Sequence, residues 1–188
     1  MAVVASLDAQ LVQDFVNTRD RRSFVPRGHP HRDGTRDDLR SPESLCAWLE
    51  DHGLLPGRTR VSPSDHARAL DLRTALRAAL GAAAPEQAGG ATAFTTSLQV
   101  EIDPREGPSL SSPGRGVDHA VAEICAAALR AKLTGEWWRL RACAADDCQW
   151  VFFDESKPGR GRYCSPEMCG NRVKTRAYRQ RRTAESAR

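Results

Sequence analysis

Apolar side chains recur at helical spacing near the start of the chain, over residues 7–18. Leu11 and Phe15 are four positions apart, as are Val12 and Val16, so all four fall on one face of a helix. This pattern predicts an amphipathic first helix with one face in the core.

Two later segments combine a common start signal with an apolar stripe. Ser41 precedes Pro42 and Ser62 precedes Pro63; serine is a preferred N-cap, and proline suits the first helical turn. The stripes that follow are Leu45, Trp48 and Leu49 in one segment, and Leu72, Ala75, Leu76, Ala79 and Leu80 in the other. We therefore expect two capped helices, and a further helix capped by Asp118.

The other segments lack a helical period. Residues 19–40 are polar and rich in proline and glycine, which predicts a long surface loop. His29 and His31 in this loop have no neighbouring cysteine, so they are weak candidates for metal binding. β-Branched and polar residues alternate over residues 95–102, and a second short stretch follows a turn, which predicts a small β-hairpin.

These elements predict a mainly α fold of the α+β class, with two domains. Residues 1–136 form a helical domain with the small hairpin, and residues 137–188 form a second unit. No apolar run approaches the roughly 18 residues that span a bilayer, so no membrane partner is expected. The first ten residues lack the basic and apolar parts of a secretory signal, so we expect a cytoplasmic protein.

The positive charge of the chain is concentrated in its last quarter. Residues 139–188 contain twelve Lys and Arg against six Asp and Glu, whereas residues 1–138 contain sixteen against eighteen. A local excess of positive charge beside an ordered motif favours an anionic partner, most commonly nucleic acid. A solvated basic helix that serves solubility is the alternative.

The six cysteines are of two kinds. Cys46 and Cys125 stand alone in apolar helical patterns and are expected to be small buried residues. The other four form two pairs with the same internal spacing: Cys143 with Cys148, and Cys164 with Cys169. In a cytoplasmic chain, paired cysteines indicate a metal site. Two disulfides or an iron–sulfur cluster are the alternatives.

The residues between the cysteines predict how four sulfurs converge. A tight turn over residues 144–147 lets the first pair face one point, and QWVFFD (residues 149–154) has the pattern of a strand. ESKPGRGR (residues 155–162) supplies a turn and a return strand, and Ser165 caps a helix with Cys169 in its first turn. Four thiolates match a closed tetrahedral site, so we expect a structural zinc ion.

The predicted finger is a zinc-stabilised β-hairpin plus helix of treble-clef-like form, and its helix is strongly basic. Cys169, Val173 and Ala177 form an apolar stripe that can pack on the finger or on the first domain. The candidate nucleic-acid-binding residues are Arg172, Lys174, Arg176, Arg179, Arg181 and Arg182. Arginine on a rigid helix can make bidentate contacts to phosphate or guanine. For Tyr178, packing against neighbouring side chains is favoured over stacking on a base.

The cysteine motif resembles the CGNR zinc finger, named for the residues that stand here at 169–172. The matching positions are Cys143, Cys148, Phe153, Asp154, Ser156, Arg162, Tyr163, Cys164, Ser165, Val173, Lys174 and residues 169–172. DFVNT (residues 14–18), SPESLCAWL (residues 41–49) and the helix beginning at Asp118 resemble the domain called ABATE, described as a stress-induced transcription regulator. The resemblance implies zinc binding through the four cysteines and a DNA-binding regulatory role. Asp14 and Asn17 match its N-terminal signature, where helix capping or tethering of a loop is expected.

We therefore expect a zinc-dependent transcription regulator that binds duplex DNA through its basic helix. A protein-interaction or RNA-binding module is the alternative, since zinc-held hairpins serve all three kinds of partner. The small surface of a single finger favours a homodimer. No serine or cysteine nucleophile stands in a recognisable catalytic motif, so no enzyme activity is expected. The sequence identifies no effector ligand.

Overall fold

The computed structural model describes residues 3–22, 24, 36–57, 59–82 and 92–186. Most of the expected loop between residues 19 and 40, with His29 and His31, lies outside the described residues, and so does most of the segment 81–90. Among the described helices, none is long and apolar enough to cross a membrane.

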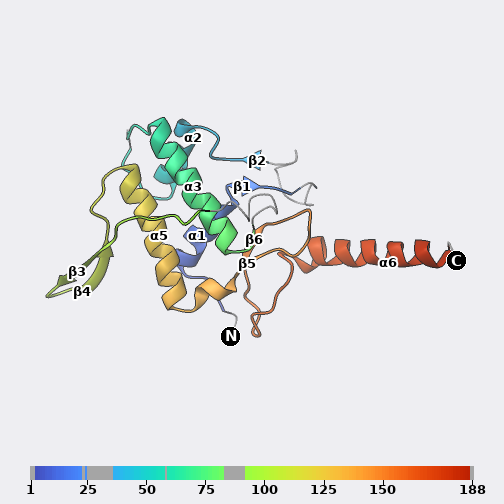
Figure 1. Cartoon of the computed structure of the whole chain (residues 1–188). Coiled ribbons are helices and arrows are strands. Elements are labelled where there is room, and N and C mark those ends of the chain that lie inside the picture. The colour runs from blue at the N-terminus through green and yellow to red at the C-terminus, as the bar shows by residue number, and fades with distance from the viewer. Residues whose placement is uncertain (1–2, 23, 25–35, 58, 83–91, 187–188) are drawn as a thin grey trace.

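Four helices form the body of the molecule (Figure 1). They are α1 (Leu7–Asn17), α2 (Pro42–Asp51), α3 (Pro63–Ala79) and α5 (Val117–Leu133). α1 lies against α5, and both contact α3. Their facing side chains form one apolar core, in which Phe15, Leu45 and Ile124 are completely buried. The four helices predicted for this part of the chain are thus confirmed.

Local hydrogen bonds start α2 and α3 where the sequence predicts. The Ser41 hydroxyl accepts the N–H of Ser44, and the Ser44 hydroxyl accepts the N–H of Ser41. Ser62 and Asp65 exchange the same pair of hydrogen bonds at the start of α3. Each reciprocal pair satisfies backbone donors that the helix itself leaves unpaired.

Two predicted details of the helices are wrong. α5 begins at Val117, and Asp118 lies within its first turn, where its carboxylate pairs with Arg68 of α3 instead of capping the helix. On α3, Ala79 is exposed although the periodicity placed it in the buried stripe. Ala79 is the last residue of the helix.

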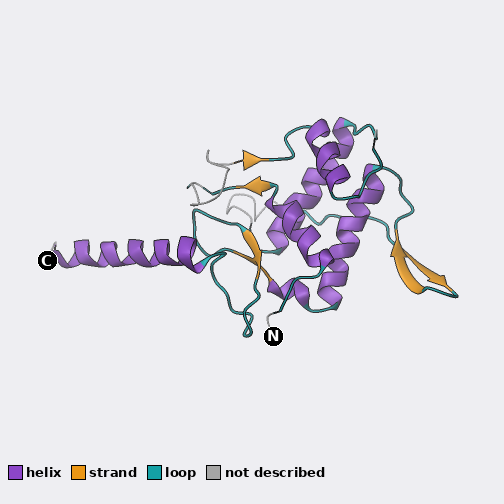
Figure 2. Cartoon of the chain, turned by 180° about the vertical axis from the view of Figure 1, so that it is seen from behind, coloured by secondary structure: helices purple, strands orange, loops and turns teal. Residues whose placement is uncertain are grey.

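Short strands form three antiparallel pairs within the described part of the chain. They are β1 (Arg19–Asp20) with β2 (Arg36–Asp37), β3 (Gln99–Asp103) with β4 (Gly107–Ser111), and β5 (Leu140–Ala142) with β6 (Val151–Phe153). The β3–β4 pair confirms the predicted hairpin, with Val100 opposite Leu110. It extends from the body on the side opposite the C-terminal helix (Figures 1 and 2).

The C-terminal region begins with a short helical turn, η1 (Glu136–Arg139), that leads into β5. Leu140 of β5 and Val151 of β6 are buried in the same core as the helices, so this hairpin packs directly on the body. Beyond it, the turn η2 (Pro166–Gly170) runs into α6 (Asn171–Ser186), which projects away as a single helix (Figure 2). The mainly α, α+β architecture expected from the sequence is confirmed.

Two arginines on α3 are buried, which the apolar pattern did not reveal. Arg73 donates to both carboxylate oxygens of Asp37 on β2, at 2.7 Å each. Arg77 donates to the carbonyl of Val16 on α1 at 2.7 Å and to that of Gln149, next to β6, at 3.3 Å. Buried charges require such partners, so these arginines tie α3 to β2, α1 and the C-terminal hairpin.

Candidate metal centre and basic helix

Cys143 and Cys148, the first cysteine pair, lie at the ends of a tight turn between β5 and β6. The N–H of Cys143 donates to the carbonyl of Trp150, and the N–H of Cys148 donates to the carbonyl of Ala145, both at 2.9 Å. Gln149 has a φ of 55°, which turns the chain back toward β6. The predicted turn between the paired cysteines is therefore present.

The strand after this turn pairs with a different partner from the one predicted. β6 pairs with β5, so that Leu140 lies opposite Phe153. The sequence placed a return strand within residues 155–162, but the structure has a loop there. Its backbone carbonyls accept hydrogen bonds from Arg139 and Arg141. The predicted return strand is therefore wrong, and side-chain hydrogen bonds from Arg139 and Arg141 hold the loop.

The second cysteine pair is delivered by a capped helical turn, as predicted. The Ser165 hydroxyl accepts the N–H of Met168 at 3.2 Å, and the Ser165 carbonyl accepts the N–H of Cys169 at 3.0 Å. Cys169 is completely buried. Burial and the charge of Cys143 raise the pKa of Cys169, so a bound cation is needed to hold this thiol deprotonated.

The four sulfur atoms lie within 4.8 Å of one another. Cys164 Sγ is 3.7 Å from Cys148 Sγ and 3.6 Å from Cys169 Sγ. All four cysteines are free thiols in this structure, with no disulfide among them. Sulfurs that each lie about 2.3 Å from one tetrahedral ion are about 3.8 Å apart, which matches the observed spacing. The cluster therefore fits a structural zinc ion held by Cys143, Cys148, Cys164 and Cys169.

Hydrogen bonds within the cluster favour a thiolate at Cys143 and a neutral thiol at Cys148. Hydrogen bonds from Cys148 and Cys164 lower the pKa of Cys143 to about 2. The hydrogen bond that Cys148 shares with Cys143 raises the pKa of Cys148. The Cys143 thiolate is thus stabilised by neighbouring thiols that keep their protons. Four thiolates at this spacing require a positive ion among them to offset their repulsion.

Asn17, at the end of α1, joins the body to the finger. Its side-chain N–H donates to the carbonyl of Val151 at 2.7 Å, and its Oδ1 accepts the N–H of Val151 at 2.9 Å. The amide therefore occupies the free edge of β6 in the way a neighbouring strand would. Of the two roles expected for Asn17, the structure shows a tether, although to a strand and not to a loop. Asp14 is exposed.

Arg22 and Phe24, which follow β1, lie beside the metal centre. The Arg22 guanidinium pairs with Asp20 and lies 4.1 Å from the centre of the Trp150 ring. Phe24 packs on the cluster of residues around the cysteines, and the guanidinium of Arg172 lies 3.3 Å from the centre of its ring. No pattern in the sequence pointed to these contacts, because they join positions far apart along the chain.

Two of the predicted nucleic-acid-binding arginines contact the turn of the first cysteine pair. Arg172 Nη2 lies 2.6 Å from Asp147 Oδ1, and Arg176 Nη2 lies 3.2 Å from Asp147 Oδ2. Lys174 and Arg179 are exposed, as are the remaining predicted residues farther along α6, Arg181 and Arg182. Two of the six cations, Arg172 and Arg176, thus bind Asp147 at the start of α6, which we call its root. The other four are exposed to solvent.

The apolar stripe of α6 is short. Val173 packs on the cluster around the cysteines, and Ala177 is partly buried. Tyr178 is 52% exposed and belongs to neither apolar cluster of the described residues, so the packing expected for it is not observed. Beyond the second turn, α6 is exposed on all sides.

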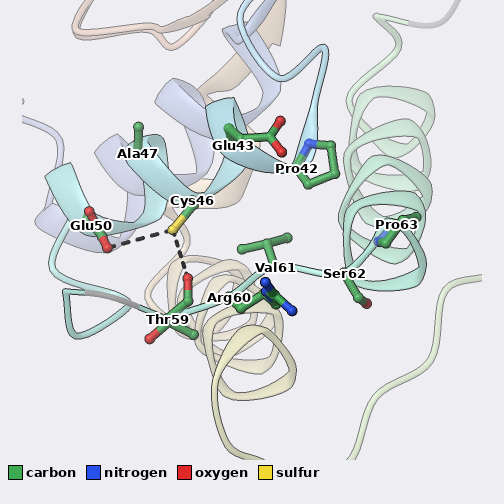
Figure 3. Close-up of a pocket in the computed structure, with 10 residues that line it drawn as sticks. All are labelled: Pro42, Glu43, Cys46, Ala47, Glu50, Thr59, Arg60, Val61, Ser62 and Pro63. Carbon is green, nitrogen blue, oxygen red and sulfur yellow. Dashed lines mark hydrogen bonds between the residues drawn. The ribbon is translucent and has the colours of Figure 1, made fainter.

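A groove between α2 and the segment before α3 contains Cys46 (Figure 3). Its volume is about 800 Å³. The Cys46 thiol donates to the carbonyl of Thr59 at 3.2 Å and faces Glu50 at 3.6 Å. Burial and the Glu50 charge raise the pKa of Cys46, which disfavours a thiolate nucleophile. Cys46 and Cys125 are both partly buried, and neither belongs to the cysteine cluster.

The fold and the cysteine cluster define a zinc-finger protein. The family model for the CGNR zinc finger matches residues 139–182. The ABATE family model, described as "Putative stress-induced transcription regulator", matches residues 9–146. The second match spans more than half of the chain, so the protein belongs to the ABATE family and carries a CGNR zinc finger. No curated protein matches the chain. The two family descriptions indicate zinc binding and a regulatory role.

Proposed function

We propose that the protein is a zinc-dependent transcription regulator whose α6 binds duplex DNA. The observation that carries this proposal is the form of α6. Its root is fixed to the metal centre by Asp147 and Val173, while the rest projects into solvent. The helix contains six Arg and Lys against a single acid, Glu185. A rigid cationic helix of this kind matches a polyanionic partner.

The six cations have two roles in this proposal. Arg172 and Arg176 hold the root of α6 through their ion pairs with Asp147. The guanidinium N–H groups that do not bind Asp147 can donate to phosphate. Lys174, Arg179, Arg181 and Arg182 supply phosphate contacts along the exposed part of the helix. Phosphate contacts provide most of the affinity of such interfaces and make it dependent on salt.

We assign regulation to residues 1–136 and nucleic-acid binding to residues 137–188. A single finger has little surface for specific recognition, so the active form is a homodimer that places two α6 helices on two half-sites. Free thiols are needed for zinc, which fits a reducing, cytoplasmic compartment.

The experiment compares zinc-loaded full-length proteins for binding to a labelled duplex over a range of salt concentrations. The first variant is Lys174→Ala/Arg179→Ala/Arg181→Ala. Its matched control, Arg105→Ala/Arg115→Ala/Lys132→Ala, removes three exposed cations from the body of the molecule. The α6 variant should lose about one unit of salt slope for each cation, whereas the control should keep the wild-type slope.

Equal slopes for wild type and the α6 variant would contradict the proposed function. Parallel titrations with single-stranded DNA and a structured RNA identify the nucleic acid. A clear preference for the structured RNA would replace the DNA assignment with the RNA-binding alternative.

A further inference from the structure

We propose that the loop of residues 155–162 is a second phosphate-binding element of the finger, beside α6. The inference rests on the proposed function, because it assigns further contacts to the same nucleic acid. The loop carries three exposed cations, Lys157, Arg160 and Arg162, and one exposed acid, Glu155. It contains no aromatic side chain on which a base could stack, and we assign its cations to phosphate, the group that most protein–DNA hydrogen bonds contact.

The loop is built around the carboxylate of Asp154, which is 4% exposed. Asp154 Oδ1 accepts the N–H of Ser156 at 3.1 Å, and Oδ2 accepts the N–H of Gly161 at 2.6 Å. Burial opposes ionisation, but these hydrogen bonds and the charge of Arg141 hold the pKa of Asp154 below its ordinary value. The carboxylate is therefore charged, and its hydrogen bonds are made inside the loop.

Two arginines of the adjoining elements hold the outer part of the loop. Arg139 Nη1 donates to the carbonyls of Asp154 and Ser156, at 2.8 and 2.9 Å. Arg141 Nη1 donates to the carbonyl of Gly159, at 2.8 Å. Since side chains bind the backbone of the loop at both ends of the turn, its conformation is fixed without help from its own cations.

Those cations have no acidic partner. No ion pair within the described ranges involves Lys157, Arg160 or Arg162. The Arg162 guanidinium faces the ring of Tyr163, whose centre is 5.8 Å away. Cations on an ordered loop can bind phosphate without first breaking an ion pair and without ordering the backbone.

The metal centre fixes this loop relative to α6. The carbonyl of Arg162 accepts the N–H of Ala144, in the turn of the first cysteine pair, at 2.8 Å. The next residue, Tyr163, packs in the same cluster around the cysteines as Val173 of α6. The loop therefore enters the metal centre where α6 leaves it, so the position of its cations relative to those of α6 is fixed.

The test uses the zinc-loaded full-length chain and a labelled duplex of random sequence, titrated at several salt concentrations. Lys157→Ala/Arg160→Ala/Arg162→Ala should weaken binding and lower the salt slope by about two to three units. The body control Arg105→Ala/Arg115→Ala/Lys132→Ala changes the net charge equally and should keep the slope. Arg160→Lys/Arg162→Lys retains the charges and should bind with the wild-type slope.

The outcomes separate the two proposals. If the loop variant keeps the wild-type slope while the α6 variant loses it, the loop inference is overturned and the proposed function stands. If wild type does not bind the duplex, the proposed function fails and the loop inference fails with it. The zinc content of each variant shows whether its metal centre is intact. The variant Lys157→Glu/Arg160→Glu, which places negative charge on the loop, should bind the duplex more weakly than the alanine variant.

Discussion

Arg172 Nη2 lies 2.6 Å from Asp147 Oδ1, which ties the basic helix α6 to the turn that carries the first two metal ligands. Arg176, one turn along α6, reaches the other oxygen of the same carboxylate at 3.2 Å. One acidic residue therefore binds the first two turns of α6 to the finger. The side chain of Arg172 is 29% exposed and that of Asp147 is 20% exposed, so solvent screens this interaction only in part.

Replacing Asp147 by alanine should loosen the root of α6. Because both ion pairs are partly exposed, the loss in the free energy of unfolding should be about 1 kcal/mol or less. Amide hydrogen exchange should show faster exchange in the first two turns of α6. Asp146→Ala is the matched control, since Asp146 is exposed and no ion pair of the described residues involves it. Equal exchange in the two variants would contradict the role given to Asp147.

Zinc binding should depend on the four clustered cysteines alone. Cys148→Ser should abolish stoichiometric zinc and unfold the region from β5 to α6, because the metal supplies on the order of 10 kcal/mol of folding free energy in such sites. Metal analysis after dialysis and circular dichroism would measure both effects. Cys46→Ser should keep one zinc ion per chain. Loss of zinc in that control would show that the metal site extends beyond the cluster.

Asn17→Ala should destabilise the contact between α1 and β6. The substitution leaves the buried N–H and carbonyl of Val151 without partners, at a cost of about 2–4 kcal/mol. Denaturant unfolding monitored by circular dichroism measures this loss. Gln10→Ala, which removes an exposed amide from the same helix, should change stability by less than about 0.5 kcal/mol. Similar losses in the two variants would show that Asn17 does not join the finger to the body.

The ion pair between Arg73 and Asp37 should make stability depend on pH. Burial opposes ionisation of Asp37, but hydrogen bonds and charge from Arg73 hold its pKa below the ordinary value. An aspartate with a lowered pKa stabilises the folded state above the unfolded pKa, about 3.9, and this contribution is lost as pH falls through the folded pKa.

Asp37→Asn should therefore be less stable than wild type at pH 6, and the difference should shrink as pH falls toward 3. Unfolding curves at each pH measure it, and the comparison removes effects that both proteins share, such as protonation of the zinc ligands. Asp51→Asn, at an exposed helix end, should show a much smaller change with pH. A constant difference between wild type and Asp37→Asn would count against the prediction.

Gly161→Ala should displace the loop of residues 155–162. A Cβ atom at this position would lie 2.9 Å from Asp154 Oδ1, and the buried carboxylate cannot move away without losing its hydrogen bonds. We expect a loss of about 1–2 kcal/mol in stability and a salt slope for duplex binding close to that of the loop alanine variant. At Gly57 a Cβ would meet open space, so Gly57→Ala should leave both quantities unchanged.

The sequence by itself determined the features that depend on neighbours a few residues apart. The caps at Ser41, Ser62 and Ser165, the β3–β4 hairpin and the turn of the first cysteine pair all follow from short-range hydrogen bonds and side-chain spacing. The number and spacing of the cysteines indicated a tetrahedral metal site, because zinc chemistry restricts the ligands to few arrangements.

Only the tertiary structure decided which distant segments meet. Asn17 binds Val151 across 134 positions, and Arg77 binds Gln149 across 72. β6 pairs with β5, not with the segment that follows it, and arginine side chains of η1 and β5 bind two carbonyls of that segment. The partners of buried polar groups depend on the path of the whole chain, and residue type and local spacing do not specify that path.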